Sequence, residues 1–388
     1  MDSLERRGVS VGLCLSLYLE EVPMHLRSGR RYQFGELGED YFVKRRVENA
    51  GGSKNGDGDG TIASNGVSNQ RGGYWLATYD HFKKSKCGML DPTNPLAASW
   101  FKCAVKEEIL DHASASFWLA SAGGPPLYAH YASSSNVGLS FHNSYAQRWT
   151  KLNRDAIREA GRDGDTFVIV DAAFGTVARH AGCTALGDRV VDFRRDDGGG
   201  VLRSIVNGIV NGGFSGLTHG HCAVSMTAPK LLTKTMDSKS REMICRWMEI
   251  AAFTTLFRTH DGDAGAGLLS GYDDVRVVGQ LARFSHVYAA LSEYRLRLLD
   301  EASFRGRPVV RHPALHFPND GRFDCRGVDV EKRRRKDGYS SSYGDGSAFM
   351  LGDLVYVVPV VKCGAAKRKI YLPEGGWIHL WVSRIVPV

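Results

Sequence analysis

Apolar positions along the chain follow two patterns, one with the period of a helix and one of short continuous runs. The segment 94–110 opens with Asn-Pro and then spaces apolar residues three and four positions apart, which predicts a helix with one buried face. The run 166–173 (TFVIVDAA) is apolar and β-branched, as in a parallel strand covered on both faces. By the same criteria we predict helices at 143–160, 201–210, 243–253 and 282–300 and strands at 116–120 and 214–218. This alternation indicates βαβ units around a parallel sheet.

The two ends of the chain have a different texture. Residues 50–73 are Gly, Ser, Asn and Asp with few apolar positions, as in a flexible insert. Near the C-terminus, short strand-like runs separated by turn residues lie at 349–361, 370–373 and 377–386. We therefore expect three parts: a poorly structured segment at 1–73, an α/β part at 74–315 and a small antiparallel β module at 316–388.

Composition and charge exclude several classes of protein. With 43% hydrophobic residues the chain can bury a core, so disorder over its whole length is excluded. No apolar run approaches the ~20 residues that cross a bilayer, so no membrane partner is expected. Much of the net charge of +8 lies in one run at 332–336, and no basic face interleaved with aromatic residues is evident, so no nucleic-acid partner is expected. The run is interpreted as a solvated loop, with a nuclear-localisation patch as the alternative.

Cysteine usage and the N-terminus bear on the compartment. The eight cysteines are scattered without a C-x-x-C pair, which favours reduced thiols over a disulfide framework. The apolar stretch 9–19 is followed by Glu20 and Glu21 in place of a small-residue cleavage site, so it is a poor signal peptide. We expect a cytoplasmic or organellar protein in preference to a secreted one.

Two segments resemble metal-binding sites, but each lacks a required ligand. The run 55–60 (NGDGDG) resembles a calcium loop, but its twelfth position is Gly66 where a bidentate glutamate is required. His219, His221 and Cys222 form an H-x-H-C cluster, but a structural zinc site needs four ligands and no fourth is evident. We expect no metal.

A set of motifs in fixed order is more specific than any of these. The segment 91–95 (DPTNP) comes before the first predicted strand, and 186–193 (LGDRVVDF) follows the apolar run at 166–173. Further motifs follow at 246–262 (RWMEIAAFTTLFRTHDG), 307–311 (RPVVR), 349–353 (FMLGD) and 371–377 (YLPEGGW). From about residue 74 to 381 this set closely resembles glycoside hydrolase family 31, in the branch of α-glucosidases and sulfoquinovosidases.

The resemblance implies both a fold and a chemistry. The implied fold is a partial (β/α)8 barrel of the TIM type followed by a small C-terminal antiparallel β-sandwich. The implied activity is retaining hydrolysis of α-glycosides, with a carbohydrate ligand and no cofactor. Such hydrolysis uses two carboxylates about 5–5.5 Å apart, one as nucleophile and one as general acid and base. In this fold they lie at the carboxyl ends of barrel strands.

Some of the family's site residues are retained by this alignment. Asp188 matches the general acid/base in a Gly-Asp-Gln-like motif. Arg258 and His260 match an Arg-Thr-His motif whose histidine lines the sugar pocket. Together with the altered positions below, these are the expected catalytic and substrate-binding residues.

Three positions depart from the family pattern. The family's Trp-Met-Ala-Asp-Phe-Gly-Glu aligns with 118–124 (WLASAGG), so Ser121 stands at the nucleophile position. Asp171 stands where the family has a pocket arginine. His219 aligns with the histidine of His-Ser-Asp-Ile-Gly-Gly, but the aspartate and glycines of that loop are absent.

These changes predict that hydrolysis is weak or lost, because an unactivated serine hydroxyl does not replace a carboxylate nucleophile. The alternative is a non-catalytic carbohydrate-binding or interaction protein derived from an α-glycosidase. The family also places a β-sandwich and early barrel strands before DPTNP, whereas only about ninety residues precede it here. The chain is therefore predicted to be truncated, and a partial gene product without function is a third possibility.

Overall fold

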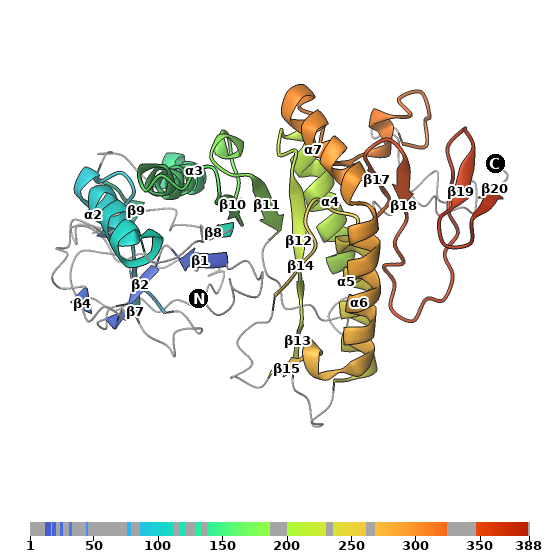
Figure 1. The fold of residues 1–388 in the computed structure, drawn as a ribbon, viewed down its shortest axis with the longest axis horizontal. Helices are drawn as coiled ribbons and strands as arrows, with labels where there is room; N and C mark the ends of the chain where they lie inside the picture. The colour runs from blue at the N-terminus through green and yellow to red at the C-terminus, as the bar shows by residue number, and fades with distance from the viewer. Residues whose placement is uncertain are drawn as a thin grey trace, which may run out of the picture. The chain divides into compact units, whose positions relative to one another are not determined.

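The computed structural model places helices and strands in alternation over much of the chain (Figure 1). It describes residues 12–16, 18–20, 24–25, 31–32, 44–45, 76–78, 86–111, 117–121, 129–132, 138–186, 200–229, 236–260, 268–323 and 347–386. The chain divides into two units, Met1–Thr184 and Ala185–Val388. The run at 55–66, the basic run at 332–336 and Asp188 lie outside the described residues.

A parallel sheet is the centre of the first unit. It is made by the strands β1 (Gly12–Ser16), β8 (Phe117–Ser121), β10 (Phe167–Val170) and the start of β11 (Cys183–Leu186), in the order β1-β8-β10-β11. The predicted strands at 116–120 and 166–173 are thus confirmed. Residues 12–16 form β1 and pair with β8 along its length. The predicted boundaries after residues 73 and 315 stay predictions.

Two helices bury one face of this sheet, α2 (Pro95–Val105) and α3 (Gly138–Glu159), and a π-helical turn, η4 (Lys106–Leu110), extends α2. The start of α2 follows from its sequence, because the Asn94 side chain accepts a hydrogen bond from Leu96 N and Pro95 occupies the first turn. Trp118 of β8 and Trp149 of α3 are almost fully buried, and the Trp118 indole donates to Asn153 at 2.9 Å. The predicted helices at 94–110 and 143–160 are confirmed.

Short antiparallel pairings complete the description of the first unit. One sheet has the order β2-β7-β6, and two further ladders join β3 with β4 and β5 with β9. Their bounds are β2 (Tyr18–Glu20), β3 (Met24–His25), β4 (Arg31–Tyr32), β5 (Lys44–Arg45), β6 (Leu76–Thr78), β7 (Lys86–Met89) and β9 (Ala129–His130). A 3-10 turn, η5 (Val177–Arg179), leads into β11.

The second unit repeats the strand and helix alternation. Its parallel strands β12 (Gly220–Ser225) and β14 (Arg258–His260) lie beside α4 (Gly200–Phe214) and α5 (Ser238–Ala251), with α6 (Val275–Ala290) packed on α5 (Figure 1). Cys222 and Val224 of β12 enter a core that includes Trp247 and Met248 of α5. A small ladder joins β13 (Thr227–Pro229) with β15 (Leu268–Ser270), and the turn η8 (Gly271–Asp273) precedes α6.

Two sequence predictions for the α/β part of this unit are wrong. The strand predicted at 214–218 does not exist, because α4 runs through Phe214 and the strand begins at Gly220. The single helix predicted at 282–300 is two helices, α6 and α7 (Ser292–Arg305), since Leu291 leaves the helical region at φ −95° and ψ 11°. The buried Arg295 guanidinium donates to the carbonyl oxygen of Tyr288, which also accepts a hydrogen bond from Leu291 N at the break.

The C-terminal part is antiparallel, as predicted. A three-stranded sheet has the order β16-β17-β18, with β16 (Val310–Arg311), β17 (Phe349–Leu351) and β18 (Val355–Val357). A 3-10 turn, η9 (Pro313–Leu315), follows β16, and β19 (Trp377–His379) pairs with β20 (Arg384–Val386). Residues 370–373 form no strand. None of the helices in the described ranges has the length and sustained apolarity of a bilayer-spanning segment.

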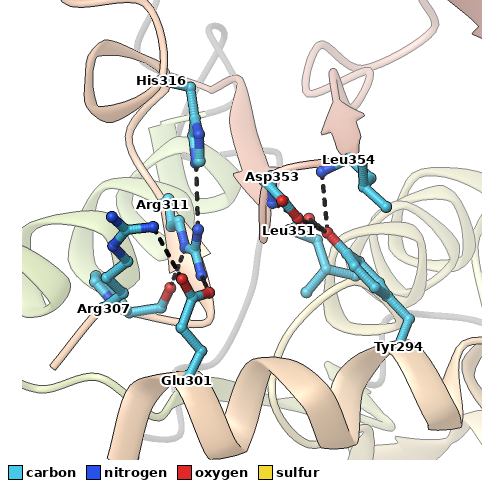
Figure 2. Close-up of polar contacts among 9 residues, drawn as sticks. Tyr294, Glu301, Arg307, Arg311, His316, Leu351, Asp353 and Leu354 are labelled. Carbon is cyan, nitrogen blue, oxygen red and sulfur yellow. Dashed lines mark hydrogen bonds and ion pairs between the residues drawn. The ribbon is translucent and has the colours of Figure 1, made fainter. Parts of the chain in front are cut away.

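Polar contacts fasten this sheet to α7 (Figure 2). Arg311 is 2% exposed and donates to the Glu301 carboxylate and, at 2.6 Å, to the Pro308 carbonyl oxygen. On the same helix the Tyr294 hydroxyl donates to Leu351 O at 2.9 Å and accepts from Leu354 N at 3.0 Å, which holds the turn after β17.

Candidate active site

The carboxyl ends of the parallel strands in the first unit carry two of the expected residues. Position 121 is the last residue of β8, and Asp171 directly follows β10. Because Ala120 pairs with Val170 across these strands, positions 121 and 171 stand level at the same edge of the sheet. Asp171 is half-buried. The sheet therefore brings positions 121 and 171 next to each other, and their expected roles stay predictions.

Asp188 has a defined place in the sequence of elements. The strand β11 ends at Leu186, and Asp188 comes two residues later, outside the described residues. Its role as general acid stays a prediction.

Arg258 and His260 lie on the same face of the second unit's parallel pair. In the ladder Ala223 pairs with Arg258 and Ser225 with His260. Since Cys222 and Val224 enter the core beneath the helices, the alternation of strand side chains puts Ser225, Arg258 and His260 on the opposite face. Met226 N donates to His260 O at 2.7 Å, which fixes the carboxyl end of β14. His260 thus stands at a strand's carboxyl end with its side chain directed away from the helices.

His219, whose expected role in substrate binding stays a prediction, lies just before a parallel strand. It precedes β12, at the amino end of the strand, whereas the site residues of a barrel gather at the carboxyl end. The residue that stands at the carboxyl end of β12 is Ser225, which is buried and level with His260. Sequence reasoning missed Ser225 because it assigned the strand to 214–218, although 220–226 (GHCAVSM) is the more continuous apolar run.

The H-x-H-C cluster does not share a face. His221 and Cys222 are consecutive residues of β12 and point to opposite sides of the strand, with Cys222 in the core beneath the helices. Burial raises the pKa of the Cys222 thiol to about 12, so it stays protonated and is a poor ligand. Within the part of the chain that the structure describes, no group of three or more metal-ligating side chains occurs.

These placements limit the chemistry of the site. In the first unit, the edge of the sheet carries the Asp171 carboxylate, and a serine occupies position 121 beside it. Covalent glycosyl transfer requires an ionised nucleophile, and a serine supplies one only when a base is positioned to take its proton. The imidazole of His260 and the guanidinium of Arg258 are suited to hydrogen-bond sugar hydroxyls.

Family models match nearly the whole chain. The TIM-barrel domain of the family 31 glycosyl hydrolases matches residues 6–300, and the C-terminal domain of the same family matches residues 306–387. These matches confirm the predicted fold class, a barrel portion followed by a small antiparallel β part.

The chain is similar to characterised proteins over part of their length. It is 30% identical over 309 residues to a sulfoquinovosidase of Agrobacterium fabrum and 26% identical over 315 residues to one of Escherichia coli, which covers 78% and 80% of this chain. The chain spans 42% of the length of each of these relatives.

Solved structures show the same fold. A sulfoquinovosidase from E. rectale in complex with an aza-sugar inhibitor superposes with a TM-score of 0.73 at 24% identity, covering 99% of this chain and 49% of that chain. An α-xylosidase from a soil metagenome complexed with xylose superposes with a TM-score of 0.69 at 16% identity, covering 99% of this chain and 51% of that chain.

Proposed function

Because the chain belongs to family 31 of the glycosyl hydrolases, we propose that it binds α-glycosides at the carboxyl ends of its parallel strands and hydrolyses them weakly or not at all. The observation that carries this proposal is the position of Ser121. It ends β8 level with Asp171, where the family's motif has its nucleophilic carboxylate.

Each remaining residue has a role that its chemistry supports. Asp188 would donate a proton to the leaving oxygen of the glycoside, which is the task of the family's general acid. Arg258 and His260 would hydrogen-bond sugar hydroxyls from the end of β14. Asp171 has the opposite charge to the family's arginine. Its carboxylate would accept hydrogen bonds from sugar hydroxyls, whereas an arginine would donate to them. His219, at the amino end of β12, is left out of this proposed site.

The expected deficit is large. Removing a nucleophile on which covalent catalysis depends lowers kcat by several orders of magnitude. General acid assistance alone contributes about 10²–10⁴-fold, so protonation by Asp188 does not restore an enzyme's usual rate. Binding is spared, because hydroxyl recognition by Arg258 and His260 does not involve position 121.

A second candidate function is a carbohydrate-binding protein without turnover. Two altered positions favour it, since Ser121 and Asp171 are neighbours at one edge of the sheet. A site that keeps its hydroxyl-binding groups while losing its nucleophile fits recognition without bond cleavage.

The test uses an aryl α-glucoside and an aryl α-sulfoquinovoside, because relatives of this chain are named α-glucosidase and sulfoquinovosidase. Phenol release is measured for the purified chain and for Asp188→Asn, and binding is measured by calorimetry. Release above the Asp188→Asn rate supports weak hydrolysis, whereas binding without release supports the binding protein. The absence of both binding and release would contradict the proposal.

A gain-of-function variant sharpens the test. Ser121→Asp restores a carboxylate at the nucleophile position, and the matched Ser121→Ala does not. We expect Ser121→Asp to raise phenol release at least tenfold above Ser121→Ala. Added azide, a small nucleophile, should accelerate Ser121→Ala by attacking the anomeric carbon, with the phenol leaving as Asp188 protonates it and a β-glycosyl azide as product.

A further inference from the structure

A cavity of about 390 Å³ opens in the first unit, away from the residues discussed so far. Its walls come from the second half of α3, the turn between α3 and β10, and the segment from η5 to β11. It lies at the amino end of β10, whereas Asp171 follows the carboxyl end, about 13 Å further along the strand. Its volume falls in the range of small-molecule sites.

Two side chains that line the cavity are not engaged elsewhere. Arg179 is exposed, and neither its guanidinium nor the His180 ring has a hydrogen-bond or ion-pair partner among the residues that the structure describes. Burial, together with the charge of Lys151, lowers the pKa of His180, so at pH 7 its neutral ring offers one donor and one acceptor. The guanidinium of Arg179 adds further donors.

Carboxylates line the same cavity and argue against a simple anion site. Asp163 pairs with Arg154 at 2.7 Å and Asp165 with Arg162 at 3.0 Å, and both carboxylates remain 39% and 58% exposed, respectively. Each retains lone pairs that accept hydrogen bonds. An anion bound at Arg179 would be repelled by these carboxylates, and a cation bound there would be repelled by the arginines.

An aromatic ring supplies an apolar wall. Phe167, at the start of β10, lines the cavity and is 42% exposed. The ring packs directly against Gly182, so closely that a Cβ at this position would lie 2.4 Å from Phe167 Cε2. A partly exposed aromatic surface next to separate donors and acceptors suits a pyranose, which has apolar C–H faces and hydroxyls that both donate and accept.

We propose that this cavity is a second saccharide-binding site, which takes a neutral pyranose between Phe167, Arg179 and the Asp163 carboxylate. The site is separate from the carboxyl ends of the strands, so it does not depend on turnover. It would hold a further part of a glycan, or another glycan, without cleaving it.

The test measures saturation-transfer NMR and calorimetric binding of methyl α-D-glucopyranoside and maltose. The background is the full chain carrying Asp171→Ala and His260→Ala, which disables the proposed carboxyl-end site. We expect saccharide binding to persist in this background and to weaken at least tenfold when Arg179→Gln is added. Arg276→Gln, at an exposed arginine of α6 outside the cavity, is the matched control and should leave binding unchanged.

Phe167→Leu is the second variant, because it keeps an apolar residue in β10 while removing the ring, and thermal melting reports whether it folds. It should also weaken saccharide binding. Loss of all binding in the Asp171→Ala, His260→Ala background would overturn the proposal, as would unchanged binding in Arg179→Gln. Binding of inorganic phosphate with no saccharide binding would overturn it in favour of an anion site. If the carboxyl-end site alone fails, binding in this background is unaffected, so the two proposals are distinguishable.

Discussion

Among single residues, the proposed chemistry depends on which position each strand presents at its carboxyl end. The strand predicted at 116–120 is present, and the structure extends it to Ser121. Ser225 was missed although the apolar run 220–226 is a signal for its strand, because Gly216 and Gly220 obscure where α4 ends and β12 begins. The order of motifs therefore predicts a site, while the exact register of β12 required its pairing with β14.

Substitutions of Ser225 and His219 are expected to affect α-glycoside binding differently. Ser225→Ala should weaken α-glycoside binding several-fold, because Ser225 is level with His260 on the face turned from the helices. His219→Ala should leave that binding unchanged, since His219 precedes the strand. Calorimetric titration with an aryl α-glycoside measures both variants, and the reverse order of effects would return His219 to the site.

Gly182 is predicted to be sterically restricted. Gly182→Ala should destabilise the chain by about 1–3 kcal/mol, because the added Cβ would overlap the Phe167 ring. Gly164→Ala is the matched control, since nothing lies within 4 Å of its Cβ position. Urea unfolding measures both, and equal midpoints would mean that the ring moves aside without cost.

At the scale of elements, helix starts were more predictable than helix ends. Asn94 and Pro95 form a local capping pattern that the sequence displays directly. The break at Leu291 has no such local mark, because it is stabilised by Arg295, whose guanidinium also donates to Thr254 O and Ala252 O near the end of α5. Contacts between distant segments of this kind are not visible in periodicity.

The ion pair between α7 and β16 predicts a pH dependence of stability. Partial burial acts to raise the pKa of Glu301, but the hydrogen bonds and charges of Arg311 and Arg307 outweigh it and hold that pKa below its usual value of 4.5. The contribution to stability is therefore present above pH 4.5 and is lost as the pH falls through the lowered pKa of the folded state. Urea unfolding from pH 7 to pH 3 should show this loss.

Substitutions on α7 test whether this loss of stability at low pH comes from Glu301. Glu301→Gln should destabilise the chain by about 2–3 kcal/mol at pH 7, because it leaves the Arg311 charge, which is 2% exposed, without its counter-charge. It should also flatten the acid dependence. Glu293→Gln, at an exposed position of the same helix, should change neither, and an equal effect of both variants would contradict the assignment.

Over the whole molecule, the chain combines a barrel portion and a C-terminal domain of glycosyl hydrolase family 31. The fold class could be predicted because a set of motifs that resembles those of the family occurs in order along the chain. The chain spans less than half the length of the sulfoquinovosidases it matches, so restored activity in Ser121→Asp would also show that this length suffices.

The most direct measurement is steady-state phenol release from an aryl α-glycoside by the purified chain and its Ser121→Ala variant. We predict that the two proteins release phenol at the same low rate, because neither carries a carboxylate at position 121. Rapid turnover by the unaltered chain that Ser121→Ala abolishes would contradict it, because the serine would then be acting as the nucleophile.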